Sequence, residues 1–316
     1  MFAAPLPMHI PDGFLSVAVS IVFWVISVIV IGISLARVNR DLGERQVPVM
    51  GVLAAAIFAG QMLNFSVTGG TSGHLLGAAI ATILLGPWAA VLVMTCVVAI
   101  QALIFQDGGL LVLGANLFNM AIIGPFVAYP VYKLIQRISG GKSWGVFVGG
   151  GVAAWASIFV ASLSCALQIA LSGTSPANVA IPAMAGIHAL IGLGEALITV
   201  GALSLVYAAR RDLIQTGAVQ PARSNTAVWV GGGLLTLALV ILSPLASAHP
   251  DGLEWVAEQA GFIETARNPS YNIIPDYVLP GISNEATATI LAGVVGALIV
   301  LAAALALAYT RRKRSA

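Results

Sequence analysis

The chain has 316 residues, of which 59% are hydrophobic and only 8% are charged. Soluble domains carry roughly 25% charged residues, so this composition excludes a soluble globular protein and indicates that a bilayer solvates most of the surface. The net charge of +2 gives no support for a nucleic-acid partner. Long apolar runs suit spanning helices of roughly 20 residues, and the alternating polarity of barrel strands is missing. The sequence therefore predicts an all-α, polytopic membrane protein in contact with lipid.

About nine apolar segments predict transmembrane helices, and the third and fourth meet at Gly86-Pro87. The predicted helices span 15–36, 47–64, 73–86, 88–105, 110–132, 144–171, 180–208, 227–247 and 287–310. A polar stretch after the seventh helix predicts a linker, and an acidic loop joins the last two helices. We therefore expect three units, which are a seven-helix unit over 8–210, a cytoplasmic linker over 211–226 and a two-helix unit over 227–316.

The basic residues support this helix count and predict an orientation. If the N-terminus is outside, an odd number of spans places the C-terminus inside, and the inside segments then contain 13 of the 14 Lys and Arg residues. Only Arg267 falls outside, so the positive-inside rule is satisfied almost completely. We predict an outside N-terminus and an inside C-terminus. The inside residues are Arg37, Arg40, Arg45, Lys133, Arg137, Lys142, Arg210, Arg211, Arg223, Arg311, Arg312, Lys313 and Arg314.

The segment from Met8 to Gly13, directly before the first predicted helix, carries the most informative pattern. A chain that started at Met8 would present a terminal amine, then the backbone nitrogen of His9, then its imidazole. These nitrogens can close adjacent five- and six-membered chelate rings around one metal ion. A fourth nitrogen would complete a square plane, which suits Ni²⁺ or Cu²⁺. The turn-forming residues Pro11 to Gly13 would let the terminus fold inward.

His74 is the candidate fourth ligand. It ends a glycine-rich segment that begins at Gly69 and lies on the predicted outer side, before the third helix. Glycines allow close backbone approach, but a lone histidine at a helix start is more often a cap or a hydrogen-bonded core group. The residues alone therefore leave ligation by His74 open.

Polar side chains in or near the outer ends of other helices form a second candidate set. Four of them are amides, namely Gln61, Asn64, Gln101 and Asn116. His188 and Glu195 are seven residues apart and share a helix face, and Glu195 is the only acidic residue inside a predicted span. An intramembrane carboxylate indicates function by default, whereas a hydrogen-bond network between helices is the structural alternative.

The sequence shows no Walker-type GxxxxGK[ST] motif and no nucleophile–base arrangement, so we do not expect an enzyme. Energy for transport would come from a partner or from a gradient. A self-sufficient, proton-coupled metal transporter that uses His188 and Glu195 as a relay is one alternative. An integral-membrane enzyme is another, although no catalytic constellation supports it. The cysteines, Cys96 and Cys165, lie in apolar runs without metal-ligand spacing.

Three stretches resemble the cobalt/nickel-specific S component of energy-coupling factor (ECF) transporters, the CbiM/NikM family. These are Met8-His-Ile-Pro-Asp-Gly, then Gly70-Thr-Ser-Gly-His74, and Gln101 followed by Gln106-Asp-Gly-Gly109 and Asn116. The likeness covers about residues 8–210. The last two helices, with Pro250-Asp-Gly-Leu-Glu254 after the first of them, resemble the small PDGLE-type accessory subunit (CbiN or NikN), fused here in one chain.

The resemblance implies Ni²⁺ or Co²⁺ as transported substrate, without an organic cofactor, for nickel enzymes or cobalamin synthesis. It implies ligation by the amine of Met8, the backbone and imidazole nitrogens of His9, and His74. We expect the amides Gln61, Asn64, Gln101 and Asn116 to support this geometry as a second shell. The implied partners are a transmembrane T component (CbiQ- or NikQ-like) and ATPase subunits (CbiO- or NikO-like) in a bacterial inner (plasma) membrane.

The family motif normally begins the protein, yet seven residues precede Met8 in this sequence. Such an extension would convert the Met8 amine into an ordinary amide and remove one ligand. We therefore predict that translation starts at Met8, or that Met1 to Pro7 are removed.

Overall fold

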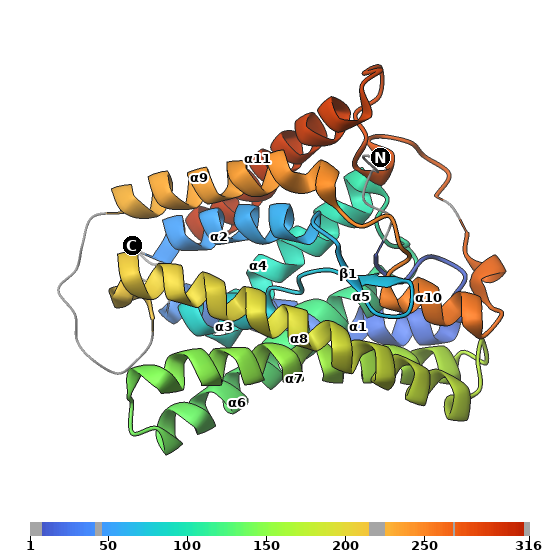
Figure 1. The fold of residues 1–316 in the computed structure, drawn as a ribbon, viewed down its shortest axis with the longest axis horizontal. Helices are drawn as coiled ribbons and strands as arrows, with labels where there is room; N and C mark the ends of the chain where they lie inside the picture. Colours follow the sequence, from blue (N-terminus) through green and yellow to red (C-terminus); the bar gives the residue numbers. More distant parts are fainter. Residues whose placement is uncertain (1–7, 42–45, 215–224, 268, 313–316) are drawn as a thin grey trace.

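The computed structural model describes residues 8–41, 46–214, 225–267 and 269–312, and these form a bundle of helices (Figure 1). The α-helices are α1 (Val17–Asp41), α2 (Gln46–Gln61), α3 (Ala78–Leu85), α4 (Pro87–Ile100), α5 (Leu113–Asn116), α6 (Gly124–Ile138), α7 (Ser143–Leu171), α8 (Ala177–Ala209), α9 (Thr226–Leu242), α10 (Gly252–Gln259) and α11 (Glu285–Arg312). The π-helix η1 (Gln101–Phe105) continues α4, and η2 (Leu117–Ile123) joins α5 to α6.

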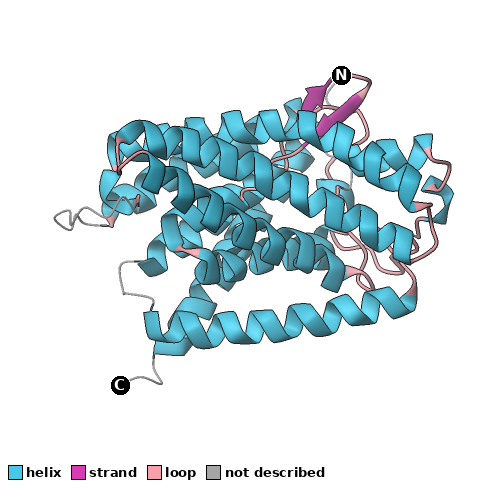
Figure 2. Ribbon diagram, turned by 90° about the horizontal axis from the view of Figure 1, so that it is seen from below, coloured by secondary structure: helices cyan, strands magenta, loops and turns pink. Residues whose placement is uncertain are grey.

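The remaining elements are short. They are the 3₁₀ helices η3 (Arg211–Leu213), η4 (Ser243–Leu245), η5 (Ile263–Thr265) and η6 (Pro275–Tyr277), and the strands β1 (Phe65–Val67) and β2 (Thr71–Gly73). The two strands form an antiparallel hairpin, and the described residues contain no other sheet (Figure 2). The fold is therefore helical, as the sequence predicts.

All nine predicted segments contain helix, and the polytopic membrane fold is confirmed. Within the described ranges, seven helices are long and apolar enough to cross a membrane. The helix α2 is shorter, with 16 residues. The helix α3 has only eight residues, which gives a length of about 12 Å at 1.5 Å per residue. It is too short to cross a bilayer by itself, so nine full-length spans are not reached.

The third predicted helix, 73–86, begins later than expected because glycine conformations replace its first turns. The hairpin turns at Gly69 and Gly70, whose φ angles are 88° and 77°, and Gly77 has a φ of 78°. Backbone with positive φ favours glycine, and it cannot continue a right-handed helix. Residues 74–77 therefore lie in an irregular stretch between β2 and α3, which we call the His74 segment.

The two ends of the bundle differ in charge. The start of α2, the α6–α7 turn and the end of α8 lie at the left of Figure 1, whereas the α7–α8 connection and α10 lie at the right. Lys133 and Lys142 flank the α6–α7 turn and Arg210 follows α8, while Arg267 lies at the other end in the chain after η5. This is the segregation that the predicted topology requires, and the orientation itself stays a prediction. Arg45, Arg223, Lys313 and Arg314 lie outside the described residues.

The last two long helices pack directly on the preceding ones. Both α9 and α11 contact α2, and α11 also contacts α4. The chain between them, residues 246–284, contains α10, which packs against α8 and β2. We call this stretch the accessory loop. It places a region late in the sequence over the same end of the bundle as residues 8–12, which we call the N-terminal segment.

Candidate metal centre

The N-terminal segment has no regular structure, and side chains of a neighbouring loop and helix satisfy its backbone. The backbone nitrogen of Ile10 donates to Asn116 Oδ1 (3.0 Å), and Ile10 O accepts from Asn116 Nδ2 (3.0 Å) and from Gly109 N (2.9 Å). The Asp12 carboxylate accepts from Leu111 N at 2.9 Å. A side chain at Gly109 would meet Asp12 Oδ1 at 2.1 Å, so this close approach requires glycine. These contacts satisfy the backbone of the segment, and Asp12 also forms an isolated β-bridge with Arg267.

Three nitrogen atoms converge on one carboxylate oxygen. Asp107 Oδ1 lies 2.6 Å from Met8 N, 3.1 Å from His9 N and 3.3 Å from His9 Nδ1. Asp107 is only 1% exposed, and a buried carboxylate requires donors to offset its lost hydration. The three donors are the same nitrogens that the chelate hypothesis requires, so they already lie around a common point.

Both imidazoles of the site have one ring nitrogen bonded to a backbone carbonyl. His9 Nδ1 lies 3.1 Å from Asp107 O, and His74 Nδ1 lies 3.1 Å from Leu75 O. Since a carbonyl only accepts, Nδ1 carries the hydrogen in each ring and Nε2 carries the lone pair. His74 Nε2 is therefore in the correct state to bind a metal ion, whereas His9 Nδ1 would have to leave Asp107 O to join a chelate.

The two rings lie close together. Their centroids are 5.8 Å apart, and the planes meet edge to face at 79°. His9 is 5% exposed, and its Nε2 atom has no hydrogen-bond partner among the described residues. Desolvation by burial, and then the proximity of His9, lower the pKa of His74 to about 4. The imidazole of His74 is thus neutral at physiological pH, which is the form that binds metal ions.

Helices α2 and α8 position the His74 segment. Gln61 Nε2 donates to Leu76 O at 2.9 Å. The Glu195 carboxylate accepts from Leu76 N at 2.7 Å and from Gly77 N at 3.0 Å. Because a carboxylate accepts strong hydrogen bonds from backbone amides, Glu195 fixes the end of the segment that presents His74.

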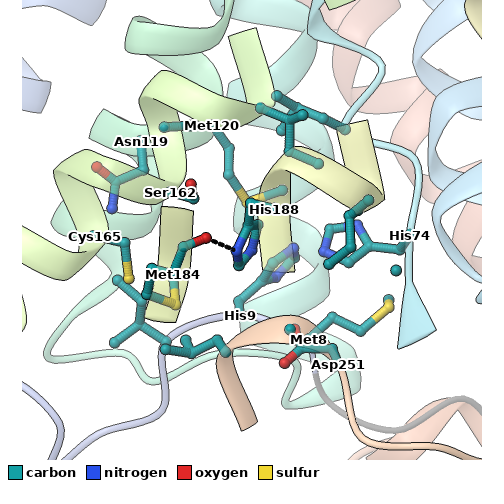
Figure 3. A pocket seen from close by; sticks show the side chains of 18 of the residues that line it. Met8, His9, His74, Asn119, Met120, Ser162, Cys165, Met184, His188 and Asp251 are labelled. Atoms are coloured by element: carbon teal, nitrogen blue, oxygen red, sulfur yellow. Dashed lines mark hydrogen bonds between the residues drawn. The ribbon is translucent and has the colours of Figure 1, made fainter. Parts of the chain in front are cut away.

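One cavity of about 80 Å³ lies between these segments. His9, His74 and His188 line it, together with Met8 and Asp251, and Figure 3 shows the three imidazoles gathered around its centre. Within the described ranges, no three His, Cys, Asp or Glu side chains are close enough to bind an ion by themselves. A metal centre at this cavity would therefore depend on the backbone nitrogens of the N-terminal segment.

The accessory loop covers the site and bonds to both of the segments that form it. Ser72 N donates to Pro250 O at 2.8 Å, and Ser72 Oγ donates to His249 O at 2.9 Å. Arg267 N donates to Asp12 O at 2.7 Å. The loop therefore bonds to the hairpin before His74 and to the end of the N-terminal segment.

Acidic residues of the accessory loop lie beside the cavity. Asp251 caps α10 by accepting from Glu254 N at 2.7 Å. Burial, followed by the charge of Glu254, raises the pKa of Asp251 well above its usual range, and burial raises the pKa of Glu254 to about 7. These carboxylates therefore give up protons less readily than exposed ones.

Tyr277 links the accessory loop to Asp107, the residue on which the three nitrogens converge. Its hydroxyl donates to Asp107 Oδ2 at 2.5 Å. Its ring stacks on Phe105, with centroids 4.8 Å apart and planes at 15°. Burial, and then the charge of Asp107, raise the pKa of Tyr277 well above its usual range, so the hydroxyl remains a donor at neutral pH.

The predicted site residues fall into two groups. Met8, His9 and His74 come together at the cavity, and Asn116 and Gln61 bond to the segments that carry them. The side chains of the other two amides, Asn64 and Gln101, are buried and do not line the cavity, although the Gln101 side chain lies beside the Tyr277 hydroxyl. Gln101 O accepts from Asp107 N at 3.1 Å, and Asn64 O accepts from Ser247 N at 2.8 Å.

The two residues of the relay hypothesis have different surroundings and different hydrogen-bond partners. His188 lines the cavity, with Nδ1 bonded to Met184 O at 3.0 Å. Glu195 is not among the cavity-lining residues, and both of its oxygens accept backbone amides. Each residue therefore has a structural partner of its own.

Sequence reasoning assigned no role to Asp107 or Tyr277. Asp107 lies in a Gln-Asp-Gly-Gly turn that the resemblance includes, so an acidic residue at a tight turn near the site was the available signal. Tyr277 lies far along the chain, in an irregular loop, and no local pattern marks it.

The fold and this cavity define a class: a polytopic helical membrane protein whose N-terminal segment and a histidine-bearing hairpin enclose a nitrogen-rich site. Comparisons with known proteins identify the family. Residues 9–213 match CbiM, the cobalt uptake substrate-specific transmembrane region, and residues 226–313 match the PDGLE domain. The chain belongs to the CbiM family, in a form fused to a PDGLE domain.

Several relatives share both parts. A putative fused nickel transport protein NikMN of Archaeoglobus fulgidus is 40% identical over 98% of this chain and 100% of its own length. The fused nickel transport protein NikMN of Rhodobacter capsulatus is 34% identical, over 87% of this chain and 84% of its own. The crystal structure of a truncated transition metal transporter has a TM-score of 0.56 and 36% identity, and covers 64% of this chain and 98% of that one.

Proposed function

We propose that this chain is the substrate-binding membrane component of an ECF-type importer for Ni²⁺ or Co²⁺ in a bacterial plasma membrane. The observation that carries the proposal is the convergence of Met8 N, His9 N and His9 Nδ1 within 3.3 Å of one point. His74 lies beside this point with its ring 5.8 Å from that of His9. Four nitrogens can thus surround one ion.

The chemistry of the donor set favours a transition metal. The Met8 amine and the two His9 nitrogens would form adjacent chelate rings, and His74 Nε2 would complete the set. Square-planar nitrogen coordination suits Ni²⁺, and cobalt relatives share the same motif. The Asn116 contacts to Ile10 and the Glu195 contacts to the His74 segment would orient the ligands, as second-shell groups do in metal sites.

The chain supplies recognition, and partners supply energy. A transmembrane T component and an ATPase pair would reorient the loaded binding unit and release the ion inside, for nickel enzymes or cobalamin synthesis. The charge segregation of the bundle supports this direction, because the cavity lies at the end opposite the described basic clusters. Fused relatives are named as nickel transport proteins, and a relative of the first unit is named a cobalt transport protein.

Ligation by the Met8 amine requires a mature chain that begins at Met8. Residues 1–7 lie outside the described residues. We infer that they are absent from the functional protein, since an amide at Met8 is a far weaker ligand than a terminal amine. Intact mass of the purified protein tests this point directly.

The decisive experiment measures Ni²⁺ binding and ATPase-dependent uptake for His74→Ala. We expect affinity to fall by at least about 100-fold, the upper range seen even for outer-shell substitutions, and uptake to be lost. The matched control is His249→Ala, because His249 is an exposed histidine of the accessory loop. Unchanged uptake with His74→Ala would rule out the ligand assignment.

The proton-coupled alternative is tested by the same uptake assay. It requires uptake without the ATPase and a specific loss with Glu195→Gln. The engagement of both Glu195 oxygens by Leu76 N and Gly77 N argues for a structural role, so we expect uptake to depend on the ATPase.

A further inference from the structure

The Asp107 carboxylate joins two parts of the chain that are far apart in sequence. Its Oδ1 atom accepts from Met8 N at 2.6 Å and His9 N at 3.1 Å, and its Oδ2 atom accepts from Tyr277 at 2.5 Å. The backbone nitrogen of Asp107 is also fixed, since it donates to Gln101 O at 3.1 Å. One buried side chain therefore connects the proposed ligands to the accessory loop.

We propose that Tyr277 is a positioning residue for the metal site. Its hydroxyl orients Asp107 so that Oδ1 gathers the Met8 and His9 nitrogens before the ion arrives. This inference rests on the proposed function and assigns the PDGLE unit a direct part in ordering the ligands.

The physical reason is the cost of ordering a chain terminus. Fixing the backbone of a flexible terminus costs conformational entropy, and a binding reaction that must order three donors loses that free energy from its affinity. An anionic oxygen at the convergence point orders the donors in the ion-free protein. Metal–nitrogen bonds are about 2.0–2.1 Å, so an ion bound by the same nitrogens would take over the space next to Oδ1.

Replacement of hydrogen bonds by metal ligation at these nitrogens would change only non-covalent contacts of Asp107. As the ion binds, the Met8 ammonium and the His9 amide would each release a proton to solvent, and bonds from these nitrogens to the metal would replace their hydrogen bonds to Oδ1. The bond from Tyr277 to Oδ2 is on the other side of the carboxylate and remains. Asp107 therefore stays beside the bound cation as a counter-charge, which an outer-shell carboxylate commonly provides.

The ring of Tyr277 allows a clean substitution. Tyr277 is fully buried, and Phe105 and Phe58 pack around its ring, with centroids 4.8 Å and 6.1 Å away. Tyr277→Phe keeps these contacts and removes only the hydroxyl. Tyr271→Phe is the matched control, because the Tyr271 hydroxyl donates to Ala102 O at 2.7 Å. It belongs to the same loop and makes no contact with Asp107.

Two measurements on the purified full chain test the proposal. The first is the Ni²⁺ dissociation constant, which we expect to rise 10- to 100-fold in Tyr277→Phe and to stay within about twofold in Tyr271→Phe. The second is amide hydrogen exchange of a peptide covering residues 8–12 in the ion-free protein. We expect exchange to become faster in Tyr277→Phe and to remain unchanged in Tyr271→Phe.

A double-mutant comparison shows whether Tyr277 acts through Asp107. In an Asp107→Asn background, Tyr277→Phe should add no further increase in exchange over residues 8–12. An equal increase in both backgrounds, or unchanged affinity and exchange in Tyr277→Phe, would overturn the proposal. If His74→Ala abolishes binding while Tyr277→Phe has no effect, only this inference fails. If His74→Ala binds Ni²⁺ normally, the proposed function itself fails.

Discussion

The N-terminal segment and the His74 segment are both irregular stretches of chain, but different parts of the molecule fix them. Two helices of the bundle bond to the His74 segment, through Gln61 of α2 and Glu195 of α8. The N-terminal segment bonds to the 106–112 loop and Asn116, and the accessory loop covers it. One side of the cavity is therefore built on the bundle, and the other on connections that are easier to displace. We expect the ion to enter by displacing the N-terminal side.

The largest expected effect comes from the start of the chain. A chain that retains Met1 to Pro7, or one that is acetylated at Met8, lacks the terminal amine and should lose at least about 100-fold in Ni²⁺ affinity, because a strong ligand of the chelate is gone. The measurement is Ni²⁺ titration of purified chains whose N-termini are established by intact mass. Full affinity in an extended chain would remove the amine from the ligand set.

Substitution of Glu195 tests the side built on the bundle. Glu195→Ala leaves the buried Leu76 and Gly77 amides without acceptors, and each unsatisfied group costs about 1–3 kcal/mol. We expect a total loss of about 3 kcal/mol in unfolding free energy, visible as a lower melting temperature in detergent, together with weaker Ni²⁺ binding.

Glu195→Gln is the matched control for this prediction. It keeps one acceptor oxygen, so its loss of unfolding free energy should be about half that of Glu195→Ala. A proton relay predicts the opposite pattern, with normal stability and no uptake in either variant.

Acidification tests the environment of His74. Its pKa falls from 6.5 in the unfolded chain to about 4 in the folded one, so below pH 6.5 the unfolded state binds the extra proton first. The ion-free protein should therefore lose stability as pH decreases from 7.5 to 5, by about 2 kcal/mol at most from this residue. His74→Gln should show a correspondingly smaller decrease in melting temperature. Equal decreases in both proteins would mean that the imidazole is not desolvated.

The smallest effect is expected where the accessory loop meets the hairpin. Ser72→Ala removes the side-chain hydrogen bond to His249 O, while the backbone bond from Ser72 N to Pro250 O remains. A single neutral hydrogen bond contributes about 1 kcal/mol, so we expect an affinity change below about fivefold. A loss as large as that of His74→Ala would place the loop contact among the ligand-determining interactions.

The sequence was sufficient for the features that follow from local patterns. Apolar length located the helices, and the Met8-His9 and His74 motifs located the two sides of the cavity, with the family resemblance joining them. The predicted start of the third helix is wrong, because β2 extends to Gly73 and Gly77 has a positive φ, so α3 begins only at Ala78.

The sequence also could not predict contacts between residues that lie far apart along the chain. Asp107 and Tyr277 are 170 residues apart, and no periodicity connects a turn in the first unit with a loop in the second. The sequence shows Glu195 as an intramembrane carboxylate, but its hydrogen-bond donors, the Leu76 and Gly77 amides, are known only from the fold.

X-ray absorption spectroscopy of the purified full chain loaded with Ni²⁺ examines the nitrogen site without any substitution. We predict a first coordination shell of nitrogen donors in square-planar geometry, including imidazole scattering from His9 and His74. A shell made of sulfur, or of oxygen alone, would contradict the proposed metal centre.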